Sequence, residues 1–294
     1  MNSILKNQKV FLMKKPLKSA LILSFLLVLM AFTPHIDTPK QSTPLIESPC
    51  QVENSTFQAG EELTYKIYYN LNFVWIAAGE VTFKIDDMGQ QYHINAVGRT
   101  YSGYEWFFKV RDNYDTYVDK TTMLPTLSVR DIHEGKYNLY SKVSFDQKTK
   151  TAAYERGNSK SEIDKRGNLE LKDCMHDILS TVYYCRTLNY ENAQAGQAYP
   201  IKLMLDEEIH PLQYSFLGRE EKKIRDLGKW STIKFTPKVV SGNVFKEGTQ
   251  MKIWASDDAN KVPLMIESPV SVGTVKVVLK SWKNLKYETV AKKG

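Results

Sequence analysis

The chain has 294 residues, with 40 lysines and arginines against 33 aspartates and glutamates, which gives a formal net charge of +7. Residues 1–32 contain five of these lysines and no acid, so the remaining 262 residues carry 35 basic and 33 acidic side chains. This near balance removes the main support for a nucleic-acid partner, and none is expected. A hydrophobic content of 42% with 25% charged residues excludes a disordered chain and fits an ordered globular protein.

A basic and then apolar segment opens the sequence. Several lysines precede a run of thirteen residues, from Ala20 to Phe32, in which only Ser24 is polar. This pattern is typical of a secretory signal peptide, and the run is shorter than the roughly 20 residues that span a bilayer. We therefore expect residues 1–32 to direct export to the periplasm or cell envelope, with an uncleaved membrane anchor as the alternative. Residues 33–56 contain four prolines among threonine, serine and glutamine and predict an extended linker.

Residues 57–290 show a dominant hydrophobic period of two, which predicts a single β-rich domain. Polar turns at 86–91, 146–150 and 257–261 separate several of the alternating segments, as in antiparallel hairpins. No strand alternates with a long helical pattern, which disfavours a parallel sheet. The clearest alternating segments begin at Leu63, Val81, Tyr137, Ile201, Met251 and Val275.

One segment, near residues 173–187, predicts an amphipathic helix. Apolar side chains recur there at three- and four-residue spacing from Met175 to Cys185, and Asp173 is placed to cap the first turn. The polar stretch 156–172, which contains two glycines, predicts a surface loop before the helix. We expect ten or more strands in one strongly curved antiparallel sheet or open β-barrel, with the helix packed against its concave face. Two subdomains joined by the loop are the alternative.

The three cysteines limit the possible disulfides. On one helix, Cys174 and Cys185 would lie roughly 16 Å apart along the axis, which is beyond disulfide reach. If a disulfide exists it must therefore use Cys50, but the favoured interpretation is three unpaired cysteines.

The sequence contains no recognisable catalytic or metal-binding motif. It lacks GxSxG, GxxxxGK[ST], GxGxxG and HExxH, and its five histidines are scattered. We therefore assign no catalytic residue, metal or cofactor. The acids Asp257 and Asp258 lie in a short turn that lacks the further acids and the glycine of a calcium loop, so they predict a structural turn.

The tripeptide VRD occurs twice and brings two acids together with two arginines. If the strands around it form a hairpin turning near residues 121–123, Asp112 lies opposite or close to Asp131, with Arg111 and Arg130 beside them. Cross-strand salt bridges are the favoured interpretation. The alternative is the carboxylate pair of a glycoside hydrolase, but neighbouring arginines favour ionised acids and oppose the raised pKa that a general acid needs.

Aromatic residues concentrate in the first part of the domain, and the cluster from 101 to 108 is the densest. Aromatic side chains fill β cores, but on a curved sheet they also line grooves for a lipid or another apolar ligand. In the second case we expect a groove bordered by Tyr101, Tyr104, Trp106 and the apolar helix face with Ile178 and Val182.

Several separated segments resemble one known family. FQAGEELTYKIYYN, AGEVTF, FFKVRDNYDTYVD, MHDILSTVYYCR and IWASDDANKVPLMIESPVSVGTVKVVLK occur in the order seen in the domain of unknown function 3108 family, from about Phe57 to about Tyr287. The SDD segment and Arg186 at the end of the helix are similar to those in exported envelope proteins of Bacteroidetes-type bacteria. The resemblance implies an exported, mostly antiparallel β protein without an assigned reaction, so it supplies no catalytic residues.

Three functions remain open at this point. The favoured one is a non-enzymatic envelope protein that binds a lipid or another apolar or amphipathic ligand. The second is an assembly factor that contacts an envelope protein partner, and the third is a hydrolase of cell-surface material.

Overall fold

The computed structural model describes residues 50–71, 74–106, 108–237, 250–270 and 273–293. The predicted signal peptide lies outside these residues, as does the predicted linker up to residue 49. Within the described ranges, no helix combines the length and the apolar character needed to cross a membrane.

The described residues form fifteen strands, a short 3₁₀-helix and one α-helix. They are β1 (Glu62–Leu71), β2 (Val74–Met88), β3 (Gln91–Thr100), η2 (Ser102–Tyr104), β4 (Val110–Asp119), β5 (Pro125–Glu134), β6 (Tyr137–Asp146), β7 (Thr151–Ser159), β8 (Glu162–Glu170), α2 (Ile178–Thr187), β9 (Ala198–Leu205), β10 (Glu208–Ile224), β11 (Gly228–Pro237), β12 (Lys252–Ser256), β13 (Pro263–Pro269), β14 (Thr274–Lys283) and β15 (Lys292–Lys293).

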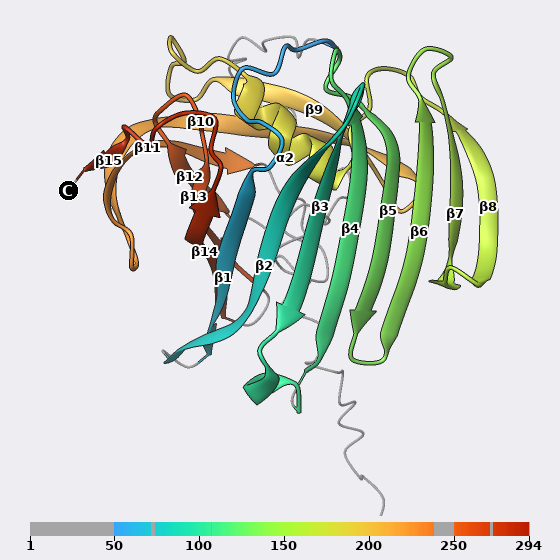
Figure 1. Cartoon of the computed structure of the whole chain (residues 1–294), viewed down its shortest axis with the longest axis horizontal. Helices are drawn as coiled ribbons and strands as arrows, with labels where there is room; N and C mark the ends of the chain where they lie inside the picture. The colour runs from blue at the N-terminus through green and yellow to red at the C-terminus, as the bar shows by residue number, and fades with distance from the viewer. Residues whose placement is uncertain (1–49, 72–73, 107, 238–249, 271–272, 294) are drawn as a thin grey trace, which may run out of the picture.

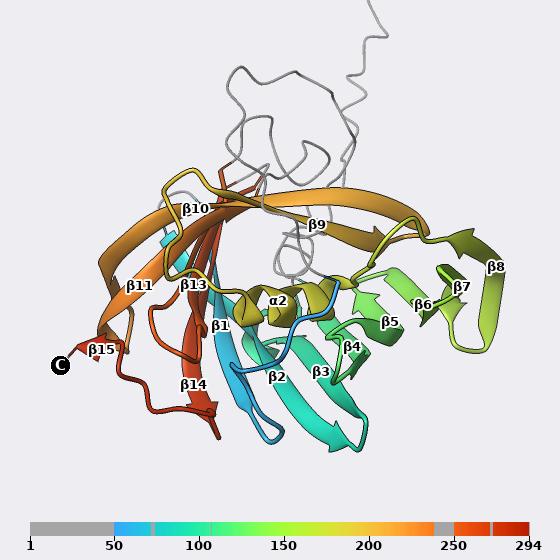
Figure 2. The ribbon, with the colours of Figure 1, turned by 90° about the horizontal axis from the view of Figure 1, so that it is seen from above.

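All of these strands belong to one strongly curved antiparallel sheet (Figure 1). Its order is β8-β7-β6-β5-β4-β3-β2-β1-β14-β13-β12-β11-β10-β9, and β15 pairs with β11. Strands that follow each other in sequence are therefore neighbours, except β8 and β9 at the two ends of the order, and β14 and β15; β1 also pairs with β14. The helix α2 lies inside the curve, between β1–β5 and β9–β10 (Figure 2). The predicted curved sheet with one helix on its concave face is confirmed.

Alternation along β4 shows why the sheet has a buried inner face. Every second residue from Val110 to Val118 is buried, and the residues between them are more exposed. Because successive side chains on a strand point to opposite faces, this inner set also contains Asp112, Tyr114 and Thr116. Polar groups are thus carried into the interior of the sheet together with apolar ones.

The prediction of a surface loop at 156–172 is wrong. These residues form the end of β7, the turn after it and the whole of β8. Most side chains of β8, an edge strand, are exposed, so it lacks the apolar alternation of an inner strand. The two glycines of this stretch, Gly157 on β7 and Gly167 on β8, serve close packing instead. A Cβ at Gly157 would lie 1.7 Å from the Glu162 carbonyl oxygen, and one at Gly167 would lie 2.5 Å from the Tyr154 hydroxyl.

The helix starts later than predicted. It begins at Ile178, so the prediction that Asp173 caps it is wrong. The chain before it stays extended because the backbone of His176 bonds to β9. Its N–H donates to the Lys202 carbonyl at 2.9 Å, and its carbonyl accepts from the Met204 N–H at 2.8 Å.

The helix is capped by Asp177 in a capping box. The Asp177 carboxylate accepts from the Ser180 N–H at 2.7 Å, and the Ser180 hydroxyl accepts from the Asp177 N–H at 2.9 Å. The second carboxylate oxygen accepts from the Thr116 hydroxyl on β4. The cap therefore fixes the first turn of α2 over the inner face of the sheet.

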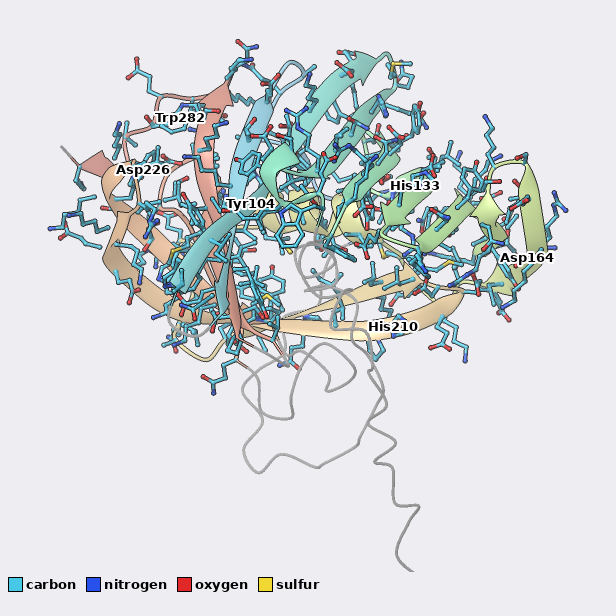
Figure 3. The ribbon with its side chains drawn as sticks, turned by 90° about the horizontal axis from the view of Figure 1, so that it is seen from below. Tyr104, His133, Asp164, His210, Asp226 and Trp282 are labelled. Atoms are coloured by element: carbon cyan, nitrogen blue, oxygen red, sulfur yellow. A yellow bond between two sulfur atoms is a disulfide. The ribbon has the colours of Figure 1, made fainter. Side chains whose placement is uncertain are left out.

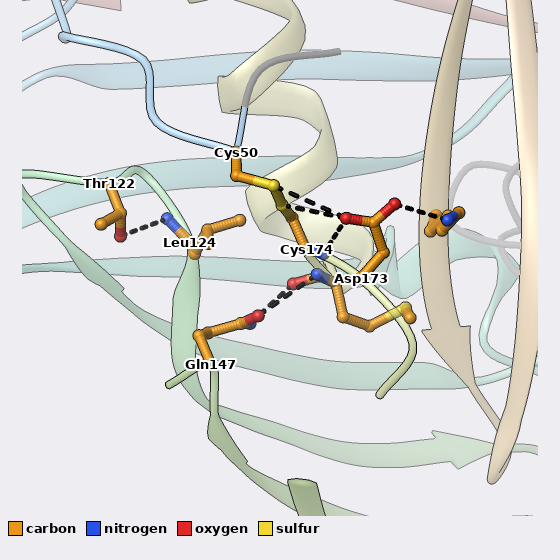
Figure 4. The surroundings of a disulfide bond; sticks show 8 residues. Cys50, Thr122, Leu124, Gln147, Asp173 and Cys174 are labelled. Atoms are coloured by element: carbon orange, nitrogen blue, oxygen red, sulfur yellow. Dashed lines mark hydrogen bonds and ion pairs between the residues drawn. A yellow bond between two sulfur atoms is a disulfide. The ribbon is translucent and has the colours of Figure 1, made fainter. Parts of the chain in front are cut away.

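A disulfide joins Cys50 to Cys174, with their Cα atoms 5.4 Å apart (Figure 4). The favoured prediction of three unpaired cysteines is wrong, and the conclusion that any disulfide must use Cys50 is confirmed. Cys174 precedes α2 instead of lying on it, while Cys185 is free. The neighbouring Asp173 carboxylate accepts from the Cys174 N–H at 2.9 Å and from the Lys202 ammonium at 2.6 Å, which ties this joint to β9.

A buried ion pair connects α2 to both halves of the sheet. The Arg186 guanidinium binds the Glu61 carboxylate through two hydrogen bonds of 2.5 and 2.8 Å, and their side chains are 3% and 0% exposed. The remaining donors of Arg186 reach the Asn260 carbonyl at 3.0 and 3.2 Å. The rings of Phe57 and Tyr183 lie near its two sides, with centroids 5.5 and 5.2 Å from the guanidinium carbon. One side chain thus joins the helix, the start of β1 and the turn between β12 and β13.

Breaking this pair is expected to destabilise the protein strongly. Arg186→Ala leaves the Glu61 carboxylate buried without its partner, which should lower the free energy of unfolding by about 3–5 kcal/mol in urea titrations. The control is Arg111→Ala, because Arg111 pairs with Glu105 near the surface, and its loss should cost only about 0–1 kcal/mol. Equal losses for the two variants would contradict the assigned role.

The disulfide is expected to contribute to stability through the length of chain that it closes. Its two cysteines are 124 residues apart, so the double variant Cys50→Ser/Cys174→Ser should lower the free energy of unfolding by about 2–5 kcal/mol. The reduced wild type should match the variant. Three reactive thiols in the denatured, unreduced wild type would show that the bond does not form.

Candidate functional site

An apolar cavity of about 150 Å³ lies between α2 and the second half of the sheet. Its walls come from α2, from β1 and β2, and from β9–β13. The lining residues include Leu63, Tyr65, Phe83, Leu179, Val182, Cys185, Ile201, Leu212, Tyr214, Ile233, Phe235, Met251, Ile253, Ala255 and Ile266. Well-packed interiors leave few voids larger than a water molecule, and apolar cavities of this size stay dry and take up apolar guests.

Four polar residues also line the cavity, and two of them are fully engaged. The Thr181 hydroxyl donates to the Asp177 carbonyl at 2.7 Å, and Arg186 is paired with Glu61. The side-chain ends of Gln213 and Lys261 have no hydrogen-bond or ion-pair partner in the described part of the chain. These two groups are available to a polar part of a guest.

The wall near Cys185 is neutral. Burial raises the pKa of the Cys185 thiol to about 12, so it stays protonated near neutral pH. The Tyr190 hydroxyl donates to the Cys185 carbonyl at 2.7 Å and lies 2.6 Å from the Tyr214 hydroxyl. Because these hydroxyls satisfy each other, the tyrosines present mainly their rings to the cavity.

The predicted aromatic groove is not assembled as expected. Val182 lines the cavity, whereas Ile178 is 3% exposed and packs in the core beside it. Tyr104 and Trp106 are 39% and 83% exposed, in and after η2. Figure 3 looks onto this end of the sheet, with Tyr104 labelled.

Distance along the sheet explains this correction. The start of α2 bonds to Thr116, which pairs with Ile94 on β3. Tyr101 follows Ile94 by seven residues, or roughly 23 Å at the rise of a strand. Its hydroxyl donates to the Glu80 carboxylate at 3.4 Å, so it belongs to a different part of the structure. Three of the five predicted groove residues, Tyr101, Tyr104 and Trp106, were therefore misplaced, because their clustering in the sequence does not put them beside the helix.

The repeated VRD tripeptides form a hairpin whose turn lies near residues 121–123, as predicted, but its register separates the two acids. Asp112 pairs with Ile132, and Asp131 pairs with Asn113. Paired residues share a face and neighbours alternate, so Asp112 points inward and Asp131 points outward. The prediction that Asp112 and Asp131 lie opposite each other is wrong, because the register of β4 and β5 differs by one residue from the one that this would need.

The two arginines pair with acids outside the hairpin. Arg111 binds the Glu105 carboxylate, which lies between η2 and β4, and Arg130 binds Asp206 at 2.6 Å in the turn before β10. The prediction that Arg111 and Arg130 pair with acids across adjacent strands is therefore wrong for both of these ion pairs. Arg111 also points away from the inner face that carries Asp112, so it does not keep that acid ionised.

A different carboxyl pair is buried on the inner face. Glu134 lies two residues beyond the partner of Asp112, and both side chains belong to residues that are 3% exposed. Neither oxygen of Glu134 accepts a bond from an N–H or O–H donor among the described residues, and its carboxyl lies within hydrogen-bonding reach of Asp112. Burial and then the neighbouring carboxylate raise the pKa of Glu134, so the pair shares a proton.

This carboxyl pair does not form an open catalytic site. Neither acid lines the cavity beneath α2, and burial leaves both almost inaccessible to a substrate. The sequence interpretation missed Glu134 because it paired the two tripeptides with each other. The alternation of Arg130, Ile132 and Glu134 on β5 carried the signal, and a one-residue change of register reveals it.

Hydrogen bonds within the turn after Ser256 support the prediction of a structural turn. Oδ1 of Asp258 accepts from the Ser256 hydroxyl at 2.8 Å and from the Asn260 N–H at 3.1 Å, and β12 and β13 flank the turn. In the described chain, three metal-type ligands come together only at Cys50, Asp173 and Cys174. The disulfide uses both of those sulfurs.

The buried carboxyl pair predicts a stability that falls as pH rises. Folded Glu134 holds a proton that the unfolded chain releases, because burial and Asp112 raise its pKa to about 9. The contribution of this pair to stability should therefore be largest below about pH 4, near the ordinary glutamate pKa, and should be lost as pH rises through the raised value. Glu134→Gln cannot ionise and should raise the free energy of unfolding at pH 8 by about 1–3 kcal/mol.

The matched control for this measurement is Glu162→Gln on β8, where the side chain is exposed. Denaturant titrations of both variants and the wild type between pH 5 and pH 9 would decide the question. A pH slope that survives Glu134→Gln would contradict the shared proton.

Known proteins show similarity at the level of family and fold. The model of the family described as protein of unknown function (DUF3108) matches residues 64–280. No curated protein matches the sequence. A β-barrel-like protein of the domain of unknown function DUF1849 from Brucella abortus has a similar fold, with a TM-score of 0.53 at 8% identity over 79% of this chain and 100% of that chain.

A Bacteroides fragilis protein with a YmcC-like fold matches 79% of this chain and 99% of its own at 8% identity. Its TM-score of 0.35 is too low to establish a shared fold. The family match agrees with the segments that carry the resemblance in the sequence, and it covers more than two thirds of the chain. The chain therefore belongs to the DUF3108 family of proteins of unknown function.

Proposed function

We propose that the protein is an exported, non-enzymatic envelope protein that binds an apolar or amphipathic ligand in the cavity beneath α2. The observation that carries this proposal is the cavity itself, which is walled mainly by aliphatic and aromatic side chains and holds two unengaged polar residues. Ligand sites share this pattern of apolar walls with a few polar groups.

Two features support export. The N-terminal basic and apolar sequence is typical of a signal peptide. The disulfide between Cys50 and Cys174 is a bond that persists mainly in oxidising compartments such as the periplasm.

A second candidate function is contact with an envelope protein partner. Trp106 and Tyr104 are 83% and 39% exposed near η2. Exposed aromatic side chains are enriched where proteins bind each other. This surface lies at the opposite end of β3 from the helix, so it would act separately from the cavity.

The ligand is expected to remain with the protein during purification from envelopes. Solvent extraction followed by mass spectrometry should find an apolar compound in stoichiometric amount with the wild type. Val182→Trp fills the cavity from α2 and should reduce the bound amount by about tenfold or more. Val97→Trp makes the same change on the outer face of β3, where Val97 is 43% exposed, and should have no effect.

Circular dichroism would first establish that both variants are folded. The proposal fails if the wild type carries no such compound and takes up none on addition. It also fails if folded Val182→Trp binds as much ligand as Val97→Trp.

A further inference from the structure

The cavity beneath α2 has two ends that differ in chemistry. One end is mainly apolar and includes Met251, Ile253 and Ile266, with the uncharged side chain of Gln213 nearby, and the other includes Arg186 and Lys261. From Met251 to the residue before Ser256, β12 advances roughly 13 Å at the rise of a strand, and the turn that carries Lys261 follows. A guest that runs along the cavity would therefore meet apolar groups first and a cationic side chain last.

The backbone of Lys261 is fixed by the turn that holds it. Its N–H donates to the Asp258 carboxylate and to the Asp258 carbonyl, both at 3.3 Å. Its φ of 45° lies in the left-handed region, where lysine is uncommon. The side chain is half-buried and lines the cavity, so the ammonium belongs to the cavity's edge.

The nearest acid to Lys261 is already engaged by the turn. Oδ1 of Asp258 accepts from the Ser256 hydroxyl and the Asn260 N–H, and Oδ2 accepts from the Ala291 N–H at 3.4 Å. The side chain of Lys261 makes no hydrogen bond or ion pair with any described residue. Asp258 therefore serves the turn and leaves the ammonium unpaired.

The other cation of the cavity is neutralised. Arg186 gives two hydrogen bonds to Glu61 and the rest of its donors to the Asn260 carbonyl. Burial, and then the charge of Arg186, lower the pKa of Lys261. The charge of Asp258 opposes these effects but forms no ion pair with the ammonium, so an anion in the cavity would relieve them further.

We infer that the ligand is a single-chain anionic amphiphile whose charged group pairs with Lys261 while its alkyl chain occupies the apolar end of the cavity. This inference rests on the proposed function and names the chemical class of its ligand. The volume of about 150 Å³ suits one short alkyl segment. A carboxylate and a phosphate monoester share the required charge.

The experiment uses the full-length protein, freed of bound compounds, and three probes with the same alkyl chain: octanoate, octyl phosphate and octanol. Calorimetric titration at neutral pH and low salt should show at least one of the anions binding about tenfold or more tightly than octanol. The stronger anion identifies the head group. The preference should shrink at high salt, because ions screen a charge pair at the edge of a cavity.

Variants at position 261 test the assigned partner. Lys261→Met keeps the length of the side chain without its charge and should remove the preference for the anion, whereas Lys261→Arg should retain it. Lys148→Met is the matched control, since Lys148 is exposed in the turn between β6 and β7 and the net charge changes equally. The turn bonds to Lys261 only through its backbone, so these variants should keep the wild-type melting temperature.

The outcomes separate the two proposals. Equal binding of octanol and both anions would overturn the anionic ligand and leave the apolar cavity as a binding site. Retention of the preference in Lys261→Met would overturn the role of Lys261. If no probe binds, both the inference and the proposed function fail.

Discussion

The buried pair of Arg186 and Glu61 is the constraint on which the arrangement of helix and sheet depends. Two charges removed from water are tolerated only when they satisfy each other and their remaining hydrogen-bonding groups. Here Glu61 stands before β1, Arg186 ends α2, and the Asn260 carbonyl belongs to the turn after β12. If any of these elements moved, the pair would separate and leave an unpaired charge buried between the remaining elements. The wall of the cavity that α2 provides is therefore fixed by an interaction outside its apolar lining.

Side chains also hold the two ends of the curved sheet together. The strand order ends at β8 and β9, and in the described part of the chain these two strands share no backbone ladder. The turn between β9 and β10 bridges this gap. Asp206 binds Arg130 at 2.6 Å and Arg156 at 3.1 Å, and Glu207 binds Lys165 at 2.9 Å. The sheet is thus closed by ion pairs across an open seam, which explains why a hairpin tip with two residues at positive φ is so strongly charged.

The sequence carries the features that depend on local periodicity. Alternation predicted the inner strands and the curved antiparallel sheet, and a three-and-four pattern predicted α2. The edge strand β8 was not predicted, because its side chains are mostly exposed and show no alternation of apolar and polar residues. The helix start was misplaced because a long-range backbone bridge at His176 overrides the local signal of Asp173. The pairing of Asp112 with Glu134 depends on strand register, and the position of Lys261 depends on turn geometry. A one-residue difference in either would move a side chain from the inner face of the sheet to the outer face.

The disulfide divides the molecule into two parts with different freedom. Cys50 and Cys174 enclose β1–β8 within a covalent ring, whereas β9–β15 lie beyond it. The helix begins at Ile178, shortly after Cys174, so the helix and most walls of the cavity lie outside the ring. Most of the cavity wall is therefore held in place by packing, hydrogen bonds and ion pairs alone, so an adjustment to a guest falls on β9–β13 more readily than on β1–β8.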